Sequence, residues 1–417
     1  MTQLVASQRA DLTFKGNKGL SRHEWLRLTP AYSVRLVQET LARWKEHENG
    51  SLRMIFDPFS GTGTTPLVAA QAGLEGVAVD INPFLVWLGS TKLQQYSLSD
   101  LQQAQDSLVE VIAWARQHLD DSDLWQPNLF KIERWWDVSS LSSLRALRAA
   151  LDSVEPSPAL DLLLVAFCQT LISSSSAAFN HQSMSFKESL QGELWDRELA
   201  HMVLSSFDVS ARSVIAQAKE PLAGSGHIIH GDSRKAVDSL RGHVDGIITS
   251  PPYANRMSYI RELRPYMYWL RYLDVSKDAG ELDWKAIGGT WGSATSALTT
   301  WQKEVDTPID DEMSEVCSRI VIEGEGKPGN KLMGKYVSKY FTDTWEHAQC
   351  VSEIVRSGGR ISYVVGNSTF YGVLVPTEKW YAAFFKAAGF RDVDIRTIRK
   401  RNSNKALYEF EVTGIKK

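Results

Sequence analysis

The sequence predicts an α/β fold built around a Rossmann-like nucleotide-binding unit. A short apolar strand runs into the glycine-rich turn DPFSGTGTT, residues 57–65, and then into a helix. A second apolar strand ends at Asp80, nineteen positions after Gly61, which is about the spacing of a ribose-binding carboxylate in a nucleotide-binding βαβ unit. The alternation of strands and helices resumes at residue 226. We therefore expect one sheet that is interrupted by an inserted segment.

The bulk composition is that of a globular chain with a sizeable core. The 417 residues are 43% hydrophobic and 23% charged, enough for two or three domains or one enlarged domain. No secretory pattern opens the chain and no apolar run reaches membrane-spanning length, so we expect a cytoplasmic protein. Cys168, Cys317 and Cys350 are scattered without CxxC spacing, which predicts neither a disulfide framework nor a metal site.

The glycine-rich turn favours a cationic nucleoside ligand over a triphosphate. It lacks the lysine of a GxxxxGK[ST] loop, and the carboxylates of Asp57 and Asp80 would repel a polyanion. S-adenosylmethionine carries an amino acid cation, a sulfonium and a nucleoside, so one carboxylate can face its amino group and the other its ribose. Gly61 and Gly63 let a ligand approach the backbone. The alternative is an ordinary tight turn.

Two other segments could complete a cofactor pocket. Thr29 and Pro30 can cap and start a helix, whose N-terminal N–H groups could face a carboxylate such as that of a methionine moiety. Alternatively, this helix simply covers the sheet edge. Asn82 could contact a nucleoside, although Asn-Pro is also turn chemistry. Asp232 and Ser233 follow a strand at its carboxyl end, where Asp232 could accept from an adenine amino group or cap a helix.

A second decisive stretch is Ser250-Pro-Pro-Tyr253, which leaves the strand around Ile247 in a stiff turn, because both prolines fix φ and donate no hydrogen bond. The Ser250 hydroxyl and the Pro251 carbonyl could bind the two hydrogens of an exocyclic amino group and favour a pyramidal nitrogen that attacks a methyl group. Tyr253 would stack on the base, which must first be flipped out of a duplex. A simple chain reversal is the alternative.

Taken together, FDPFSGTGTT, VDINP, GDSR and TSPPY make the chain resemble the S-adenosylmethionine-dependent amino-methyltransferases of DNA modification systems. The SPPY form is most often seen in their cytosine-N4 branch. The resemblance covers residues 14–90 and 226–415 and implies a Rossmann-like, seven-stranded class I methyltransferase sheet, here with a helical insertion. The cofactor-binding residues expected on this basis are Tyr32, Ser33, Asp57, Pro58, Phe59, Ser60, Gly61, Gly63, Thr64, Asp80, Ile81, Asn82, Asp232 and Ser233. The expected catalytic residues are Ser250, Pro251, Pro252 and Tyr253.

The methyltransferase domain is expected in separated parts. Residues 1–90 form its N-terminal part with the cofactor motifs, and residues 91–225 form a helical insertion with 17 acidic against 10 basic residues. Residues 226–273 form the catalytic part. Residues 274–335 show little periodicity and are the loop-rich candidate for target recognition. Residues 336–417 form the C-terminal part.

Two basic segments are candidates for contact with DNA phosphates, although solvated surface charge is the alternative for each. Between Lys386 and Lys405 there are seven basic and two acidic residues, on a predicted closing hairpin. A shorter arginine-rich segment follows Tyr253. The residues that we expect to bind DNA are Arg256, Arg261, Arg399, Lys400, Arg401 and Lys405.

The leading hypothesis is site-specific methylation of the cytosine N4 amino group in double-stranded DNA, protecting sites from a cognate restriction endonuclease. The nearest alternative is an adenine-N6 methyltransferase, although that branch usually has an acidic or amide residue where this chain has Ser250. An RNA amino-methyltransferase and a non-catalytic DNA-binding protein with the same fold are further alternatives.

Overall fold

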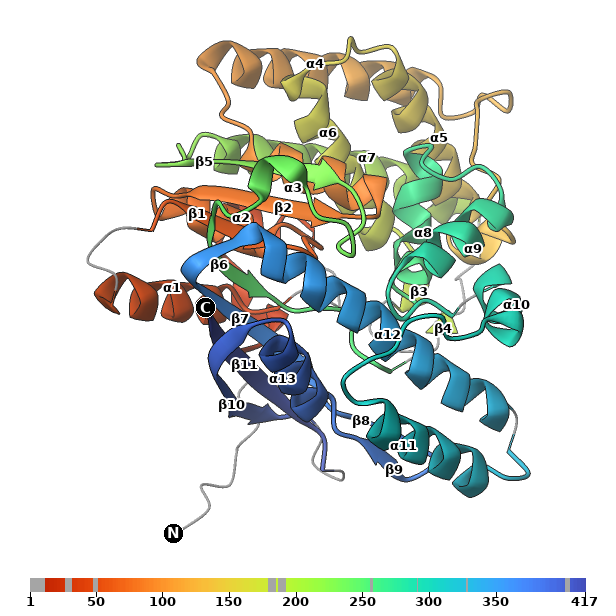
Figure 1. The fold of residues 1–417 in the computed structure, drawn as a ribbon. Coiled ribbons are helices and arrows are strands. Elements are labelled where there is room, and N and C mark those ends of the chain that lie inside the picture. Colours follow the sequence, from red (N-terminus) through yellow and green to blue (C-terminus); the bar gives the residue numbers. More distant parts are fainter. Residues whose placement is uncertain are drawn as a thin grey trace.

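The computed structural model describes most of the chain (Figure 1). The described residues are 12–26, 32–47, 52–178, 185–186, 193–255, 258–290, 292–327, 329–401 and 406–417. The predicted cap and start of the first helix, Thr29 and Pro30, lie outside them. None of the described helices is both long and apolar enough to cross a membrane.

A seven-stranded sheet forms the centre of the molecule. Its strands are β1 (Met54–Asp57), β2 (Glu75–Asp80), β5 (Ser225–His230), β6 (Val244–Thr249), β7 (Val355–Gly366), β10 (Phe390–Lys400) and β11 (Tyr408–Lys416). Their order in space is β10-β11-β7-β6-β1-β2-β5. Strands β5, β2, β1, β6 and β7 pair in parallel, and β11 is antiparallel to both β7 and β10. The predicted fold class is confirmed.

The strand order reverses between β1 and β6, which are neighbours in the sheet but far apart in the chain. Open α/β sheets bind ligands at such a switch point, outside the carboxyl ends of the strands. All six residues of β6 are buried, as expected for a central parallel strand covered on both faces.

Helices cover both faces of the sheet. α1 (Val34–His47) packs Val37, Leu41 and Trp44 against one face, and a Cβ on Gly246 of β6 would lie 2.4 Å from the Trp44 ring. This explains the glycine in that strand. α12 (Asn330–Ile354) and α13 (Thr377–Ala387) share the core cluster of the strand residues Ile247 and Ile361, and α12 runs across the sheet in Figure 1.

Several further elements connect or flank the strands of the sheet. They are α2 (Thr64–Gln71), α3 (Pro83–Leu93), α8 (Tyr259–Trp269), β8 (Ser368–Phe370) and β9 (Val373–Val375). Gly76 of β2 is needed for close packing of helix on strand, because a Cβ there would lie 2.2 Å from the Pro66 carbonyl oxygen in α2.

The predicted helical insertion is present between β2 and β5, which are adjacent strands (Figure 1). It contains α4 (Leu98–Gln117), α5 (Val138–Asp152), α6 (Pro158–Ser173), α7 (Glu193–Ala218) and the short pair β3 (Ala177–Ala178) and β4 (Ser185–Phe186). Trp135 and Trp136 are buried in its core. Both tryptophans therefore serve as core aromatics of the insertion.

The side chain of Arg22 joins the insertion to the rest of the fold. Its guanidinium donates to the carbonyl oxygens of Lys92 (2.9 Å) and Gln94 (2.7 Å) at the end of α3. It also donates to the carbonyl oxygens of Ala218 (2.9 Å) and Glu220 (2.7 Å) at the end of α7. Arg22 is 1% exposed, so four carbonyls accept from the terminal nitrogens of a buried cation where the chain leaves and re-enters the sheet.

The expectation of a loop-rich segment at 274–335 is wrong. The segment contains α9 (Ser276–Lys285), α10 (Ser293–Thr300), α11 (Asp310–Glu323) and the start of α12. α11 has the acidic first turn that stabilises a helix N-terminus, and it buries Met313, Val316 and Ile320 on one face. The helices are short and each buries few apolar residues, so the periodic signal in any one window was weak.

Candidate functional site

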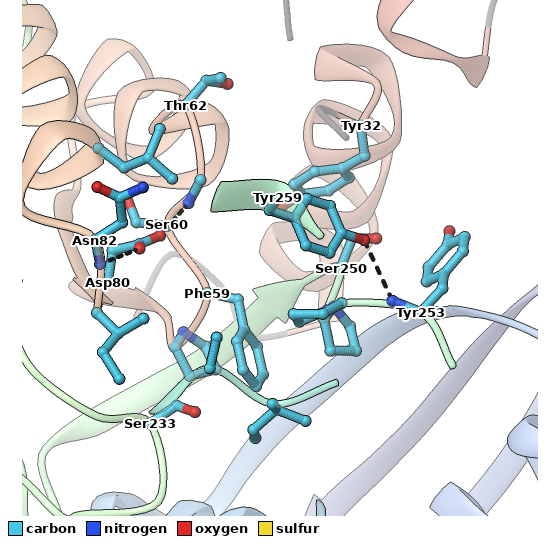
Figure 2. A pocket seen from close by; sticks show the side chains of 18 of the residues that line it. Tyr32, Phe59, Ser60, Thr62, Asp80, Asn82, Ser233, Ser250, Tyr253 and Tyr259 are labelled. Atoms are coloured by element: carbon cyan, nitrogen blue, oxygen red, sulfur yellow. Dashed lines mark hydrogen bonds between the residues drawn. The ribbon is translucent and has the colours of Figure 1, made fainter. Parts of the chain in front are cut away.

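One cavity of about 540 Å³ joins the sequence motifs. It lies at the carboxyl ends of β1, β2, β5 and β6, and Figure 2 shows side chains from these elements facing a common space. Of the residues expected in the site, those that line the cavity are Tyr32, Pro58, Phe59, Ser60, Gly61, Thr64, Asp80, Ile81, Asn82, Asp232, Ser233, Ser250, Pro251, Pro252, Tyr253, Arg399 and Arg401. The glycine-rich turn and the proline corner therefore share one hollow.

Asp80 fixes the glycine-rich turn and also faces the cavity. Its carboxylate accepts from the Gly61 N–H (2.8 Å) and from the Asn82 N–H (2.9 Å), as Figure 2 shows. Burial raises the pKa of Asp80 to about 7, although these two hydrogen bonds act in the opposite direction. The carboxylate keeps acceptor capacity for a ligand hydroxyl, because each oxygen has two lone pairs.

Asp57 lies behind the cavity wall, not in it. Its Oδ1 accepts from the Thr249 hydroxyl (2.6 Å) and the Phe59 N–H (3.0 Å), and the residue is fully buried. Burial raises the pKa of this carboxyl to about 6. Its Oδ2 has no hydrogen-bond partner in the described part of the chain. Asp57 thus shapes the junction of β1 and β6. Gly63, also outside the wall, precedes α2 with φ +77°.

The start of α1 differs from the expectation. Ser33 is buried and does not line the cavity, and the first helical N–H, that of Val34, already donates to Asn17 Oδ1 (2.9 Å). Asn17 also donates from Nδ2 to the Tyr32 carbonyl oxygen (3.0 Å). The neighbouring Tyr32 side chain is the part of this turn that reaches the cavity (Figure 2).

Asp232 faces the cavity but is held by Arg234. The Arg234 guanidinium donates to Asp232 Oδ2 (2.7 Å), and the Arg234 backbone N–H donates to Oδ1 (3.0 Å). Burial acts to raise the pKa of Asp232, but these bonds outweigh it and the pKa is lowered. Arg234 also pairs with Asp343 of α12 (3.0 Å), which ties this turn to the helix.

The proline corner leaves one carbonyl without a protein donor. The Ser250 hydroxyl donates to the Val364 carbonyl oxygen (3.1 Å), and the Pro252 carbonyl accepts from the Tyr340 hydroxyl (2.6 Å). No donor in the described part of the chain contacts the Pro251 carbonyl. The Tyr253 N–H donates to the Tyr259 hydroxyl (3.3 Å; Figure 2). The corner is therefore fixed on both sides of Pro251.

Of the described residues that we expected to bind DNA, only some line the cavity. Arg399 and Arg401 are in the cavity wall, whereas Arg261 and Lys400 are outside it. The Arg399 guanidinium makes two bonds to Glu409, of 2.7 and 2.6 Å. This pairing makes Arg399 a poor candidate for binding phosphates. Arg256 and Lys405 lie outside the described residues.

Sequence reasoning missed several wall residues. Tyr259 at the start of α8 lines the cavity, and burial raises its pKa to about 12. Leu12 and Leu36 close one side, and another side is formed at the end of α9 by Lys285, Ala286, Ile287 and Gly289. Glu409 had no motif to mark it. Among the described residues, no cluster of His, Cys, Asp and Glu is placed to hold a metal ion.

The chain is similar to type II methyltransferases. It is 22% identical over 440 residues to the type II methyltransferase M.BsoBI of Geobacillus stearothermophilus, covering 94% of this chain and 83% of that protein. It is 22% identical over 410 residues to the type II methyltransferase M.AvaI of Nostoc sp. and to that of Anabaena variabilis, covering 92% of this chain and 82% of each. No family model matches the chain.

Proposed function

We propose that the chain is an S-adenosylmethionine-dependent methyltransferase that modifies the exocyclic N4 amino group of cytosine in duplex DNA. The observation that carries the proposal is the single cavity shared by the glycine-rich turn and the Ser250–Tyr253 corner. Similarity to type II methyltransferases along most of the chain supports the reaction class. The SPPY sequence supports the cytosine target.

The cavity has features that fit the cofactor. Ser60 lines it with a buried hydroxyl that has no partner in the described part of the chain, so the wall offers a polar group that a ligand can satisfy. Asp80 faces the same space with acceptor capacity for ribose hydroxyls. We assign Ser60, Gly61, Asp80 and Asn82 to the cofactor. When bound, S-adenosylmethionine supplies an electrophilic methyl group on a sulfonium.

The proline corner holds the nitrogen that receives the methyl group. The Pro251 carbonyl accepts one amino hydrogen, and Ser250 accepts the second when its hydroxyl turns from Val364. These bonds oppose delocalisation of the nitrogen lone pair into the ring and orient it for attack. As the nitrogen gains the methyl group, the bond between that group and the sulfonium sulfur would break to leave a neutral thioether, and the nitrogen releases one proton to water. Tyr253 stacks on the base and offsets part of the cost of flipping it.

Duplex DNA is the proposed partner, and the biological role is protection of sites from a cognate restriction endonuclease. We propose that the largely helical segment 274–335 is the target-recognition region, because residues between Lys285 and Gly289 bring this segment to the cavity. The 336–417 part contributes β7, β10 and β11 to the target side of the cavity.

Methyl transfer from tritiated S-adenosylmethionine tests the proposal. Unmodified genomic DNA and transcripts of the same regions are the two substrates, and labelled nucleosides are then separated. We expect label in N4-methylcytosine from duplex DNA, and much less label with Tyr253→Ala. Label in N6-methyladenine would show that the target base is adenine, and label only in transcripts would show that the substrate is RNA. Cofactor binding without transfer to any nucleic acid would reject the proposed activity.

A further inference from the structure

Arg401 and Arg399 both line the cavity, but they differ in their carboxylate partners. Arg399 is neutralised by Glu409, whereas no carboxylate of the described residues lies within ion-pair distance of Arg401. Arg401 donates instead to the Asn367 carbonyl oxygen at the end of β7. A cation in a half-buried cavity without a counter-ion is costly unless it binds a ligand. Arg401 is therefore a candidate for contact with the substrate.

The Arg401 guanidinium is stacked on the residue proposed to hold the base. Its Cζ lies 5.2 Å from the centroid of the Tyr253 ring. Both side chains rest on Gly366, where a Cβ would lie 2.9 Å from Arg401 Cζ and 3.0 Å from Tyr253 Cδ2. The missing side chain at Gly366 thus permits the Tyr253–Arg401 stack, which places the guanidinium beside the proline corner.

One donor of Arg401 is unsatisfied. The Nε–H is buried and has no acceptor in the described part of the chain, and leaving a buried donor unpaired carries a free-energy cost. Asn367 takes one N–H of the terminal nitrogens. A guanidinium has five N–H donors in a planar fork, so Asn367 leaves further terminal N–H groups that can donate to an acceptor pair on a ligand.

We propose that Arg401 reads the Watson–Crick edge of the flipped base; this inference rests on the proposed function. When Ser250 and Pro251 bind the N4 hydrogens of cytosine, the adjacent N3 and O2 are acceptors that need donors. Arg401 supplies two N–H groups in one plane, the bidentate geometry that guanidinium groups favour. Adenine presents N1 and then a C–H at the corresponding positions, so the same fork selects cytosine over adenine.

The test couples a change in Arg401 to a change in the base. Once the modified site is mapped, duplexes carry at the target either cytosine or 3-deazacytosine, in which N3 is replaced by C–H. We expect the wild-type full-length chain to prefer cytosine about 10- to 100-fold in kcat/KM, the discrimination typical of a bidentate contact. With Arg401→Met, cytosine turnover falls by a similar factor and the two substrates differ by less than about threefold.

Arg401→Lys keeps the charge without the fork and should lose the discrimination as Arg401→Met does. Arg212→Met, at an exposed residue of α7 that pairs with Asp208, is the matched control and should keep it. Unchanged S-adenosylmethionine affinity and unfolding curves establish that the variants are folded. The inference is wrong if replacing cytosine by 3-deazacytosine lowers kcat/KM by the same factor in Arg401→Met as in the wild type. It is also wrong if Arg401→Lys discriminates between the two bases as well as the wild type does.

Failure of the proposed function is distinguished by the product of the wild type. If the wild type makes no N4-methylcytosine, the target base is wrong and the cytosine assignment of Arg401 falls with it. If the wild type makes N4-methylcytosine but Arg401→Met keeps full discrimination against 3-deazacytosine, only the role of Arg401 is rejected.

Discussion

Asp80→Asn tests the cofactor half of the cavity. The carboxylate is bound to two backbone N–H groups, at 2.8 and 2.9 Å, and we propose that it also accepts from ribose hydroxyls. The amide keeps one oxygen for Gly61 or Asn82 but presents an NH₂ group to the other donor. Loss of charged hydrogen bonds worth about 1.5–3 kcal/mol should raise the Kd for S-adenosylmethionine about 10- to 150-fold.

Isothermal titration calorimetry measures this change, and its pH dependence gives a second readout. Burial raises the pKa of Asp80 to about 7, and the ionised form is the better acceptor. The affinity of the wild type for S-adenosylmethionine should therefore weaken as the pH falls below 7. The affinity of Asp80→Asn should not show this pH dependence, because the amide does not ionise. Asp161→Asn, which lies on α6 outside the cavity wall, is the control. A wild-type Kd and pH profile in Asp80→Asn would refute the ribose assignment.

Three further outcomes are expected. Tyr253→Ala should keep cofactor affinity and lose about 5- to 150-fold in kcat/KM, because base stacking contributes about 1–3 kcal/mol; single-turnover methylation measures it. The buried Lys92 ammonium donates to the Thr62 carbonyl, and burial lowers its pKa to about 7. Between pH 7 and 10 the unfolded chain therefore binds one proton more than the folded chain, and the stability of the wild type should rise with pH. Lys92→Met should remove up to about 1.4 kcal/mol per pH unit of that rise in urea unfolding. Gly366→Ala should lower kcat/KM about tenfold or more without weakening cofactor binding, because a Cβ displaces the Tyr253–Arg401 stack; retention of wild-type turnover would contradict that packing.

The sequence predicted the parts of the fold in which several informative features lie within a short stretch of the chain. β1, its glycine-rich turn and β2 carry apolar runs, glycines and a spaced carboxylate within a short stretch. The helices between Ser276 and Glu323 were missed because each is short and buries few side chains. α9 packs against α8 and α10, α10 also packs against α12, and α11 packs against α12 and β9, so their helical state depends on contacts that a local window does not contain.

The site was predictable where a motif ends a strand, and unpredictable where the wall comes from packing. Asp80 and Tyr253 could be placed from their positions after apolar strands. Leu12, Leu36 and Glu409 reach the cavity only through the tertiary fold. Ser33 appeared at a helix start, but the side chain of Asn17, sixteen positions earlier, occupies the first N–H.

The four carbonyls gathered by Arg22 have a consequence for how a duplex can be admitted. Because one guanidinium donates to both chain segments that connect the helical insertion to the sheet, any movement of the insertion away from the sheet would have to break these four hydrogen bonds. If the proposed reaction flips a nucleotide into the cavity, we therefore expect the residues after α9 and the strands β10 and β11 to make room for it, and not the insertion. Crosslinking the insertion to the sheet should therefore leave turnover intact, whereas tethering the hairpin of β10 and β11 should stop it.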